Sequence, residues 1–396
     1  MHIVVAPDKF KGTLTARQVA DRIAAGIRVE APDVAVVRVP VADGGDGTVD
    51  AAVAAGFTRV AVRAEGPTGA PADTAFAVRD GVAVVEMADV SGLRLLPPDQ
   101  LAARDASSYG TGEVVRAAIE QGCHTVVLGI GGSASTDGRA GMLQALGARL
   151  LDAAGNELPR GGAALADLDL LDLGGLHPRL AQTRVVVAVD VDNPLLGPRG
   201  AAAVYGPQKG ADPDDVEVLD AALARWADVV DDAVGRGRSG AAAPRDRPGA
   251  GAAGGVGYAA MAVLGGELEP GIGLVLDLIR FADHLPGARL VITGEGSLDE
   301  QTLSGKAPAG VAAAALAAGV PVVTVSGRLA LTDDQLRAAG IARAYALTDI
   351  EPDVQRCLAD AGPLLERLVG QLARDWLAEP DPGSAPEVPT ELEVDR

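Results

Sequence analysis

The chain has 396 residues, a length that allows two domains with separate hydrophobic cores. Hydrophobic residues make up 48% of the chain but aromatic residues only 3%, so the core must consist of Val, Leu, Ile and Ala, which favours parallel strands packed beneath helices. A formal net charge of −20 argues against nucleic acid or an anionic membrane as a partner.

Cysteine usage and hydropathy indicate a cytoplasmic protein. Cys123 and Cys357 lie far apart and form no CxxC motif, so free thiols are expected. The apolar stretch at the N-terminus ends at Pro7, which is too short for a signal sequence, and no run of about 18 apolar residues indicates a membrane span. The sequence leaves open whether the protein is a homo-oligomer.

The predicted elements begin with a short apolar strand at residues 2–6 and a helix that starts after Thr15, where the sequence Thr-Ala-Arg-Gln forms a capping box. A second strand, residues 34–39, leads through a Gly-rich turn into a helix that stops at Gly56. Residues 58–86 alternate apolar and polar positions around Gly-containing turns, which predicts antiparallel hairpins.

Further along the chain, strands and helices alternate. Repeated strand–loop–helix units predict an α/β fold with a parallel, doubly wound sheet, and the hairpins predict a second α/β domain. Loops are expected at residues 235–250 and 294–305, and residues 379–396 have the Pro- and acid-rich composition of a disordered tail. The remaining predicted elements are helix 111–121, strand 124–130, a helix ending at Gly147, strand 184–190, helix 213–234, strand 289–293, helix 307–318 and strand 321–326.

Lysine is rare and confined to loops. Only four of the 34 basic residues are lysine, namely Lys9, Lys11, Lys209 and Lys306, and each lies in a Gly-, Pro- or Thr-rich segment. A compact ammonium group suits a phosphate oxygen, and Arg supplies the positive charge everywhere else. The distribution favours phosphate contacts, although lysines are also common in ordinary loops.

A Gly-rich loop, Gly129-Ile-Gly-Gly-Ser-Ala-Ser, lies between a predicted strand and a predicted helix. Backbone N–H groups at such a position attract anions, so Gly131, Gly132 and Ser133 are candidates for binding a phosphorylated cofactor. The alternative is a plain tight turn. The GxGxxG pattern at residues 249–254 does not follow a predicted strand, and no Walker A motif is present, which argues against the usual dinucleotide and P-loop sites.

Carboxylates occur in the same kind of loop. Asp43 and Asp46 flank a Gly-Gly pair, Asp190 ends an apolar run, and Glu295 and Asp299 bracket Gly-Ser-Leu. A Mg²⁺ ion would bridge such carboxylates to phosphate oxygens. Each carboxylate alone is also typical of a turn or a helix cap, but the combination with lysines and Gly-rich loops favours phosphoryl transfer.

Seven segments, in order along the chain, carry a specific pattern: APDKFKGTLTA, PVADGGDGT, SYGTGE, LGIGGSASTDGRAGMLQALGA, DVDNPLLGPRGAAAVYGPQKGA, GAGAAGG and ITGEGSLDEQTLSGK. Together they resemble the bacterial type I glycerate kinases, from Ile3 to about Trp376. The chain departs from the usual family pattern at Asp46, where Glu is frequent, and at residues 135–139, where the family often reads Thr-Asn-Asp-Gly-Gly. These departures affect the positioning of groups rather than the type of reaction.

The resemblance implies ATP- and Mg²⁺-dependent phosphorylation of D-glycerate, with 2-phosphoglycerate as the favoured product and 3-phosphoglycerate as the alternative. It also implies two α/β domains, one Rossmann-like and one with a mixed sheet, and an active site in the cleft between them. We expect residues 1–60 and 275–378 in the Rossmann-like domain and residues 61–274 in the second domain.

In such a transfer, protein groups position the reactants and neutralise charge rather than form covalent intermediates. Asp190 is the first candidate for the general base and, with Glu295, for a metal ligand, because it ends a predicted strand. Lys9 and Lys11 are expected to act on the substrate carboxylate or the transferred phosphate. The other candidates are Asp8, Asp43, Asp46, Lys209, Glu295 and Asp299 for substrate binding, and Gly131, Gly132, Ser133 and Lys306 for ATP binding.

Two other functions are open at this point. An acidic two-domain protein that only binds a small anion would share the Gly-rich loops, but it would not need a set of carboxylates beside phosphate contacts. A nicotinamide-dependent oxidoreductase acting on a hydroxy acid is disfavoured by the position of the GxGxxG pattern and by the lack of a catalytic His candidate.

Overall fold

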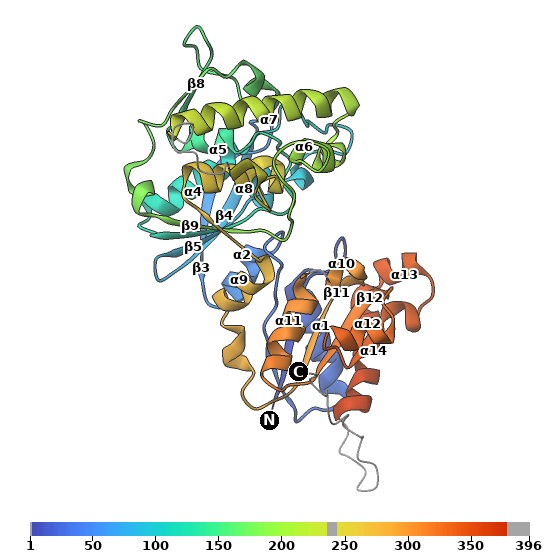
Figure 1. Ribbon diagram of the computed structural model, residues 1–396. Coiled ribbons are helices and arrows are strands. Elements are labelled where there is room, and N and C mark those ends of the chain that lie inside the picture. Colours follow the sequence, from blue (N-terminus) through green and yellow to red (C-terminus); the bar gives the residue numbers. More distant parts are fainter. Residues whose placement is uncertain (1, 236–243, 304, 378–396) are drawn as a thin grey trace, which may run out of the picture.

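Two β-sheets divide the chain into two lobes in the computed structural model (Figure 1). The structure describes residues 2–235, 244–303 and 305–377. The predicted tail, residues 379–396, lies outside the described residues, as does part of the predicted loop at residues 235–250. The predicted fold class, with two α/β domains, is confirmed.

The Rossmann-like lobe contains a five-stranded parallel sheet with helices on both faces. Its strands, in sheet order, are β13 (Arg343–Ala346), β12 (Val322–Leu329), β11 (Ala288–Leu298), β1 (His2–Pro7) and β2 (Ala35–Arg38), and its helices are α1 (Ala16–Glu30), α10 (Glu300–Leu303), α11 (Ala307–Ala317), α12 (Asp333–Ala338), α13 (Val354–Ala359) and α14 (Ala361–Leu377). Successive residues of β1 face opposite sides: Ile3 and Val5 pack with α1 and α14, and Val4 packs with α11. The predicted doubly wound parallel sheet is therefore confirmed.

Strand β11 is longer than predicted. It pairs with β12 as far as Leu298, so the predicted loop at residues 294–305 is wrong over its first part, and α10 occupies much of the rest. The glycines in this segment caused the error, because they are typical of loops. In the structure Gly294 is required inside the strand, since a Cβ atom there would lie 1.8 Å from the carbonyl oxygen of Val325 on β12.

The mixed-sheet lobe contains six strands, of which β3, β4 and β5 are antiparallel neighbours and the others are parallel. The strands, in sheet order, are β10 (Glu267–Glu269), β9 (Arg184–Ala188), β6 (Thr125–Gly129), β5 (Val82–Glu86), β4 (Pro71–Arg79) and β3 (Thr58–Glu65), and a separate hairpin is formed by β7 (Arg149–Leu151) and β8 (Leu170–Asp172). The antiparallel part confirms the predicted hairpins, and the whole sheet confirms the predicted mixed-sheet domain.

Helices cover both faces of the mixed sheet. One face packs against α4 and α8 and the other against α2, while α5, α6 and α7 form an outer layer with their own core. None of the described helices combines the length and the hydropathy needed to cross a membrane. The helices are α2 (Thr48–Ala54), α3 (Ala88–Ser91), α4 (Tyr109–Glu120), α5 (Ala140–Ala145), α6 (Ala201–Tyr205), α7 (Pro213–Ala233), α8 (Ala252–Val263) and α9 (Gly271–Leu278).

Helices α2 and α9 lie between the two sheets and shift the expected domain boundaries (Figure 1). Both α2 and β3 belong to the mixed-sheet lobe, so the chain changes lobe before α2 rather than at residue 60. The second expected boundary, after residue 274, falls inside α9. One side of α9, including Ile272 and Val275, packs with α11, whereas Leu274 and Leu278 pack against the mixed sheet. Helix α9 is therefore shared by both lobes.

Candidate active site between the two lobes

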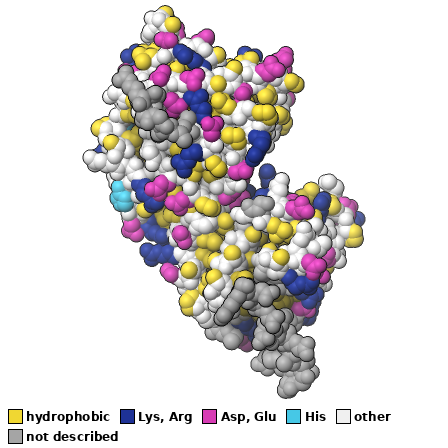
Figure 2. Space-filling view, in the orientation of Figure 1, with side chains coloured by type: hydrophobic (Ala, Val, Ile, Leu, Met, Phe, Trp, Pro, Cys, Tyr) yellow, Lys and Arg dark blue, Asp and Glu magenta, His cyan; other side chains and the backbone are white. Residues whose placement is uncertain are grey.

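Two cavities meet in the notch between the lobes (Figure 2). The smaller cavity, about 520 Å³, lies at the carboxyl ends of β1, β11, β12 and β13 in the Rossmann-like lobe. The larger cavity, about 810 Å³, lies at the carboxyl ends of β5, β6 and β9 in the mixed-sheet lobe. Ligands of parallel α/β sheets bind at this edge. Both cavities are lined by the same six residues, called the shared wall below: Lys11, Asp43, Gly45, Asp46, Gly131 and Gly132.

The shared wall forms where two Gly-rich segments touch through their backbones. Residues 43–46 follow β2 and cross from one lobe to the other, and residues 129–133 follow β6. A Cβ atom on Gly131 would lie 2.7 Å from the Cα atom of Gly45, so a larger residue would push the two segments apart. The glycines of both motifs thus place Asp43 directly beside the loop after β6.

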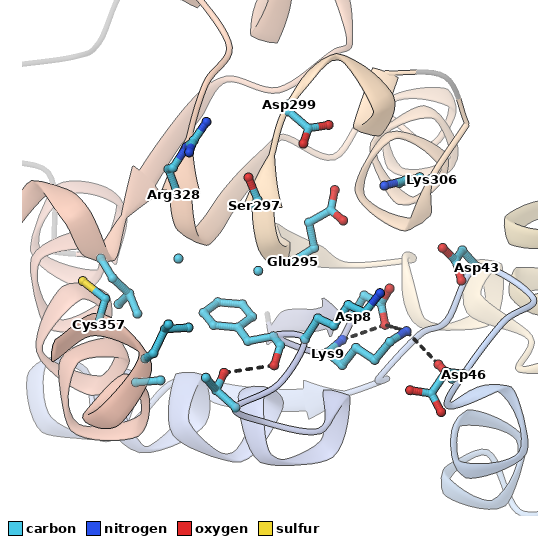
Figure 3. Close-up of a pocket in the computed structure, with 18 of the residues that line it drawn as sticks. Asp8, Lys9, Asp43, Asp46, Glu295, Ser297, Asp299, Lys306, Arg328 and Cys357 are labelled. Atoms are coloured by element: carbon cyan, nitrogen blue, oxygen red, sulfur yellow. Dashed lines mark hydrogen bonds and ion pairs between the residues drawn. The ribbon is translucent and has the colours of Figure 1, made fainter. Parts of the chain in front are cut away.

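Asp8 and Lys9 follow β1 in the smaller cavity (Figure 3). Asp8 is only 5% exposed, and its Oδ1 atom accepts the backbone N–H of Lys9 at 2.6 Å and lies 3.5 Å from Lys9 Nζ. Lys9 Nζ also donates to the carbonyl oxygen of Asp46 at 2.7 Å. Burial raises the pKa of Asp8 to about 7 against the opposing effect of Lys9, and the charges of Asp43 and Glu295 add to the increase. Such a carboxyl group exchanges a proton readily near neutral pH.

The opposite side of the smaller cavity carries Glu295, Asp299 and Lys306 (Figure 3). Glu295 accepts a hydrogen bond from Thr302 Oγ1 at 2.6 Å. Burial raises the pKa of Glu295, while the Thr302 hydrogen bond and the charge of Lys306 oppose the increase. Lys306 is the N-cap residue of α11, and its Nζ atom donates to Gln301 Oε1 at 3.1 Å. The helix N-terminus and the ammonium group together give this side an anion-binding character.

Asp43 is the carboxylate that links the two cavities. Burial is the main cause of the raised pKa values of Asp8, Glu295 and Asp190, and the charge of Asp43 adds to each of them. These carboxylates therefore repel one another across the shared wall. A hard cation among them would relieve that repulsion, and carboxylate oxygens are the ligands that Mg²⁺ prefers.

Asp190 emerges at the carboxyl end of β9, as predicted, and lines the larger cavity. Its Oδ1 atom accepts the backbone N–H of Gly271 at 2.7 Å, at the start of α9. Although the side chain keeps contact with solvent, the surrounding protein raises its pKa to about 6 by burial, against the effect of the Gly271 hydrogen bond. Glu295, its expected partner as a metal ligand, lines only the smaller cavity. The two residues therefore approach the shared wall from opposite sides.

Lys209 is part of the support for the Gly-rich loop. It is 1% exposed, and its Nζ atom donates to Ser133 Oγ at 3.0 Å and to the carbonyl oxygen of Ser135 at 2.5 Å. Burial lowers the pKa of Lys209 to about 7, against the opposing charge of Asp137. The sequence predicts a direct contact with phosphate; in the structure Lys209 lines the larger cavity, and its ammonium group also holds the Gly-rich loop through Ser133 and Ser135.

The GxGxxG pattern at residues 249–254 supports the same loop. Gly254 has a left-handed backbone with φ of 75°, and a Cβ atom there would lie 2.2 Å from the carbonyl oxygen of Ser135. Its own carbonyl oxygen accepts the N–H of Gly138 at 2.9 Å. These contacts account for Gly254, and Gly251 is required for a different contact, because a Cβ atom there would lie 2.2 Å from the carbonyl oxygen of Pro194.

An acidic cluster lies beside the shared wall. Asp46, Glu86 and Asp89 each have a carboxylate oxygen within 4.8 Å of the others. Glu86 is buried and accepts the N–H of Gly47, so it caps the N-terminus of α2, and burial raises its pKa. Arg94 pairs with Asp89 and lies 3.4 Å from Asp46. These contacts give the cluster a structural role.

The structure brings the predicted site residues together around the two cavities. Arg328 and Ser297 of the smaller cavity were not predicted as site residues from the sequence. Arg328 shows the same sequence pattern as Asp190, a charged residue after the apolar part of a strand. The apolar parts of both cavities were also missed, because leucines in loops carry no local signal. Predicted residues of the smaller cavity are Asp8, Lys9, Lys11, Asp43, Asp46, Gly131, Gly132, Glu295, Asp299 and Lys306; those of the larger cavity are Lys11, Asp43, Asp46, Gly131, Gly132, Ser133, Asp190 and Lys209.

Known proteins share this sequence and fold over nearly the whole chain. The sequence profile of the Glycerate kinase family matches residues 3–377. The chain is 41% identical over 376 residues to the glycerate kinase of Bacillus subtilis (strain 168), covering 94% of this chain and 97% of that protein. It is 45% identical over 339 residues to the glycerate 2-kinase of Escherichia coli (strain K12), covering 84% of this chain and 86% of that protein.

A solved structure agrees with these relatives. The crystal structure of a protein assigned as glycerate kinase 2 from Salmonella typhimurium LT2 matches with a TM-score of 0.80 at 40% identity, covering 95% of this chain and 98% of that chain. The resemblance seen in the seven segments is thus confirmed from one end of the described chain to the other. The protein belongs to the glycerate kinase family.

Proposed function

We propose that the protein transfers the γ-phosphoryl group of ATP to a hydroxyl group of D-glycerate. Membership of the glycerate kinase family supports this activity. The observation that carries it is the shared wall, because two ligand cavities, one in each lobe, meet at Lys11 and Asp43. Two substrates bound in these cavities would face each other there. A protein that only binds one small anion has no need of two such cavities.

The smaller cavity suits a short hydroxy acid. Lys9, Lys11 and Arg328 offer positive charge to its carboxylate, whereas Asp8 and Glu295 offer acceptors to its hydroxyl groups. Each side of the cavity carries both positive groups and acceptors, which would orient a molecule that has a carboxylate and hydroxyl groups (Figure 3). We therefore place D-glycerate in the smaller cavity.

The transfer itself is an in-line displacement at phosphorus. The glycerate hydroxyl oxygen forms a bond to the γ-phosphorus while the bond from that phosphorus to the β–γ bridging oxygen breaks, and this oxygen leaves with the electron pair as part of ADP. The hydroxyl proton passes to a carboxylate. Asp8 is the best placed for this role, because it lies in the same cavity and its pKa is about 7. Lys11 and Lys306 would stabilise the charge of the moving group.

The carboxylates around the shared wall fit a Mg²⁺ ion. Their donors are hard oxygen atoms, and their raised pKa values reflect burial and mutual repulsion that a cation would offset. Asp43 faces both cavities and would hold the ion, joined by Glu295 from the smaller cavity and Asp190 from the larger one. When bound, Mg²⁺ neutralises part of the charge of the phosphate groups.

The product we favour is 2-phosphoglycerate, because the Escherichia coli relative is named glycerate 2-kinase. The alternative is 3-phosphoglycerate. Phosphorus NMR of the product distinguishes them, since phosphorus on the secondary oxygen couples to one proton and gives a doublet, whereas phosphorus on the primary oxygen couples to two protons and gives a triplet.

The activity is tested with purified protein, ATP, Mg²⁺ and D-glycerate, compared with mixtures that lack one component. We expect ADP and phosphoglycerate in equal amounts, and only in the complete mixture. Folded protein that binds D-glycerate but produces no phosphoglycerate would support the anion-binding alternative instead.

A further inference from the structure

A single peptide group is held by both lobes. It joins Asp46 to Gly47, in the segment that crosses from the Rossmann-like lobe to the mixed-sheet lobe. Its carbonyl oxygen accepts a hydrogen bond from Nζ of Lys9, just after β1, at 2.7 Å (Figure 3). Its N–H group lies 3.1 Å from both carboxylate oxygens of Glu86, the last residue of β5, and donates to them. Because a peptide group is planar and rigid, Lys9 and Glu86 act on the same body from its two sides.

The backbone at Gly47 is suited to this contact. Gly47 is the N-cap residue of α2 and has a left-handed φ of 99°. A Cβ atom on Gly47 would have no described atom within 4 Å, so the glycine is required for its backbone conformation and not for lack of space. Glu86 is 2% exposed, and its Oε2 atom also accepts the N–H of Val49 at 3.2 Å. The carboxylate therefore fixes both the peptide group and the start of α2.

Lys9 is held in the smaller cavity by the same peptide group. Its ammonium group donates to the carbonyl oxygen of Asp46 at 2.7 Å, and it lies 3.5 Å from the carboxylate of Asp8, which is beyond the usual hydrogen-bond length. A carboxylate on the N–H side polarises the peptide group and strengthens its carbonyl oxygen as an acceptor. Glu86 itself is not among the described residues that line either cavity.

We propose that Glu86 is a positioning residue for Lys9 and acts on it through the peptide group between Asp46 and Gly47. Glu86 touches neither substrate. It holds the group whose carbonyl oxygen keeps the Lys9 ammonium beside Asp8, where the carboxylate of D-glycerate is expected. The effect on D-glycerate rests on the proposed function, whereas the link from Glu86 to Lys9 rests on the contacts alone.

Two substitutions break the link at different points. Glu86→Ala removes the acceptor of the N–H group. Gly47→Ala leaves Glu86 in place but disfavours the left-handed backbone that directs the N–H group toward it. Glu86→Gln is the conservative variant, because its side-chain carbonyl oxygen still accepts a hydrogen bond.

Each substitution has a matched control outside the site. Glu113 also accepts a backbone N–H, that of Glu65 at 2.7 Å, so Glu113→Ala removes a comparable contact. Gly56 follows the other end of α2 with φ of 92°, and a Cβ atom there would also have no described atom within 4 Å, so Gly56→Ala introduces the same backbone strain. Neither Glu113 nor Gly56 is among the described residues that line the two cavities of the site.

The first measurement is the KM for each substrate. We expect Glu86→Ala and Gly47→Ala to raise the KM for D-glycerate by about tenfold, because Lys9 is no longer held in one position. The KM for ATP should stay within about twofold, and Glu86→Gln should recover most of the wild-type KM for D-glycerate. Glu113→Ala and Gly56→Ala should lower stability without changing either KM. The same KM for D-glycerate in Glu86→Ala and Glu113→Ala would overturn the positioning role.

The second measurement, hydrogen exchange, does not depend on turnover. Mass spectrometry gives the exchange rate of the backbone amides in residues 43–49 of the protein without ligands. Glu86→Ala should speed this exchange by about tenfold or more, because the N–H groups of Gly47 and Val49 lose their acceptor. Lys9→Met should also speed it, although Lys9 contacts only the carbonyl side of the peptide group. Unchanged exchange in Lys9→Met would overturn the link, and Glu113→Ala should leave the exchange of this segment unchanged.

The two measurements separate this inference from the proposed function. A wild-type protein that forms no phosphoglycerate would refute the proposed function, while faster exchange in both Glu86→Ala and Lys9→Met would still support the link. If Glu86→Ala does not fold, Gly47→Ala provides the same KM test against Gly56→Ala. An equal KM for D-glycerate in these two glycine variants would then overturn the positioning role.

Discussion

At the scale of single residues, Arg139 combines two unfavourable features. Its backbone is left-handed, with φ of 69°, although it is not a glycine. Its side chain is fully buried, and within the described part of the chain neither terminal guanidinium nitrogen has a hydrogen-bond partner. Burial lowers its pKa to about 9, against the opposing charge of Asp137. A glycine at this position would avoid both costs.

We expect Arg139→Gly to raise the free energy of unfolding by about 1–3 kcal/mol, because it removes backbone strain and an unpaired buried charge. Arg280→Gly is the matched control, since Arg280 also has a left-handed backbone, with φ of 53°, but an exposed side chain. Arg280→Gly should raise the free energy of unfolding by about 1 kcal/mol or less, because it removes only the backbone strain. Urea unfolding measures both. A stability loss in Arg139→Gly would mean that the guanidinium has a partner such as a buried anion.

The catalytic assignment predicts different effects for two carboxylates. Asp8→Asn should lower kcat by about a hundredfold or more, because the base is lost while the fold is kept. Asp190→Asn should mainly weaken Mg²⁺ binding, so excess Mg²⁺ should restore much of its activity. In the wild type, kcat/KM should rise with pH up to about 7 as Asp8 ionises. A large kcat loss in Asp190→Asn at saturating Mg²⁺, with normal turnover in Asp8→Asn, would return the base role to Asp190.

At the scale of helices and strands, local sequence predicted most elements but not all their partners. The capping box at Thr15 begins α1, and the apolar runs of β1 and β9 form buried strands as expected. Helix α9 could not be predicted from the sequence. Apolar residues occupy two of its sides, so no single core-facing side can be recognised. Its two sides pack on different lobes, and only the tertiary structure shows which side meets which.

The contact between α9 and α11 gives a prediction for the joint between the lobes. A Cβ atom on Gly310 of α11 would lie 2.4 Å from Cγ1 of Ile272 on α9. We therefore expect Gly310→Ala to lower the free energy of unfolding by about 1–3 kcal/mol through overpacking. Adding Ile272→Ala should recover part of the loss that Gly310→Ala causes in the wild-type background, which a double-mutant cycle measures.

The control for this prediction lies on α9 itself. A Cβ atom on Gly273 would have no described atom within 4 Å, and the backbone of Gly273 is not left-handed. Gly273→Ala should therefore stabilise the protein by up to about 1 kcal/mol through helix propensity alone. Equal effects of Gly310→Ala and Gly273→Ala would show that the two helices do not touch as closely as the structure indicates.

At the scale of the whole molecule, the arrangement of the lobes determines the site. The motifs identified the loops and nearly all the charged residues, because glycine, lysine and carboxylate patterns are local. The division into two cavities depends on residues 43–46 packing against residues 129–133 of the other lobe, which no local pattern encodes. The burial of Lys209 has the same origin, since its loop composition resembles that of an exposed lysine.

Carboxylates with raised pKa values make the stability of the whole molecule depend on pH. Burial raises the pKa of Asp8 to about 7 and that of Asp190 to about 6, and it also raises the pKa of Glu86. The folded protein therefore keeps protons that the unfolded chain, with ordinary carboxyl pKa values near about 4, has already released. The unfolding free energy should fall as the pH rises from about 5 to about 8. Lys209 opposes this trend only above about pH 7, because below its lowered pKa it is charged in both states.

Mg²⁺ should reverse this loss of stability selectively, because it binds the carboxylates only once they have ionised. The melting temperature without nucleotide is measured at about pH 5.5 and about pH 8, with and without Mg²⁺. We expect Mg²⁺ to raise the melting temperature clearly at the higher pH and little at the lower pH. The Asp43→Asn substitution should remove this increase. Asp334→Asn is the control, since the side chain of Asp334 is 91% exposed on α12. An equal Mg²⁺ effect at both pH values, or one that persists in Asp43→Asn, would place the ion away from the shared wall.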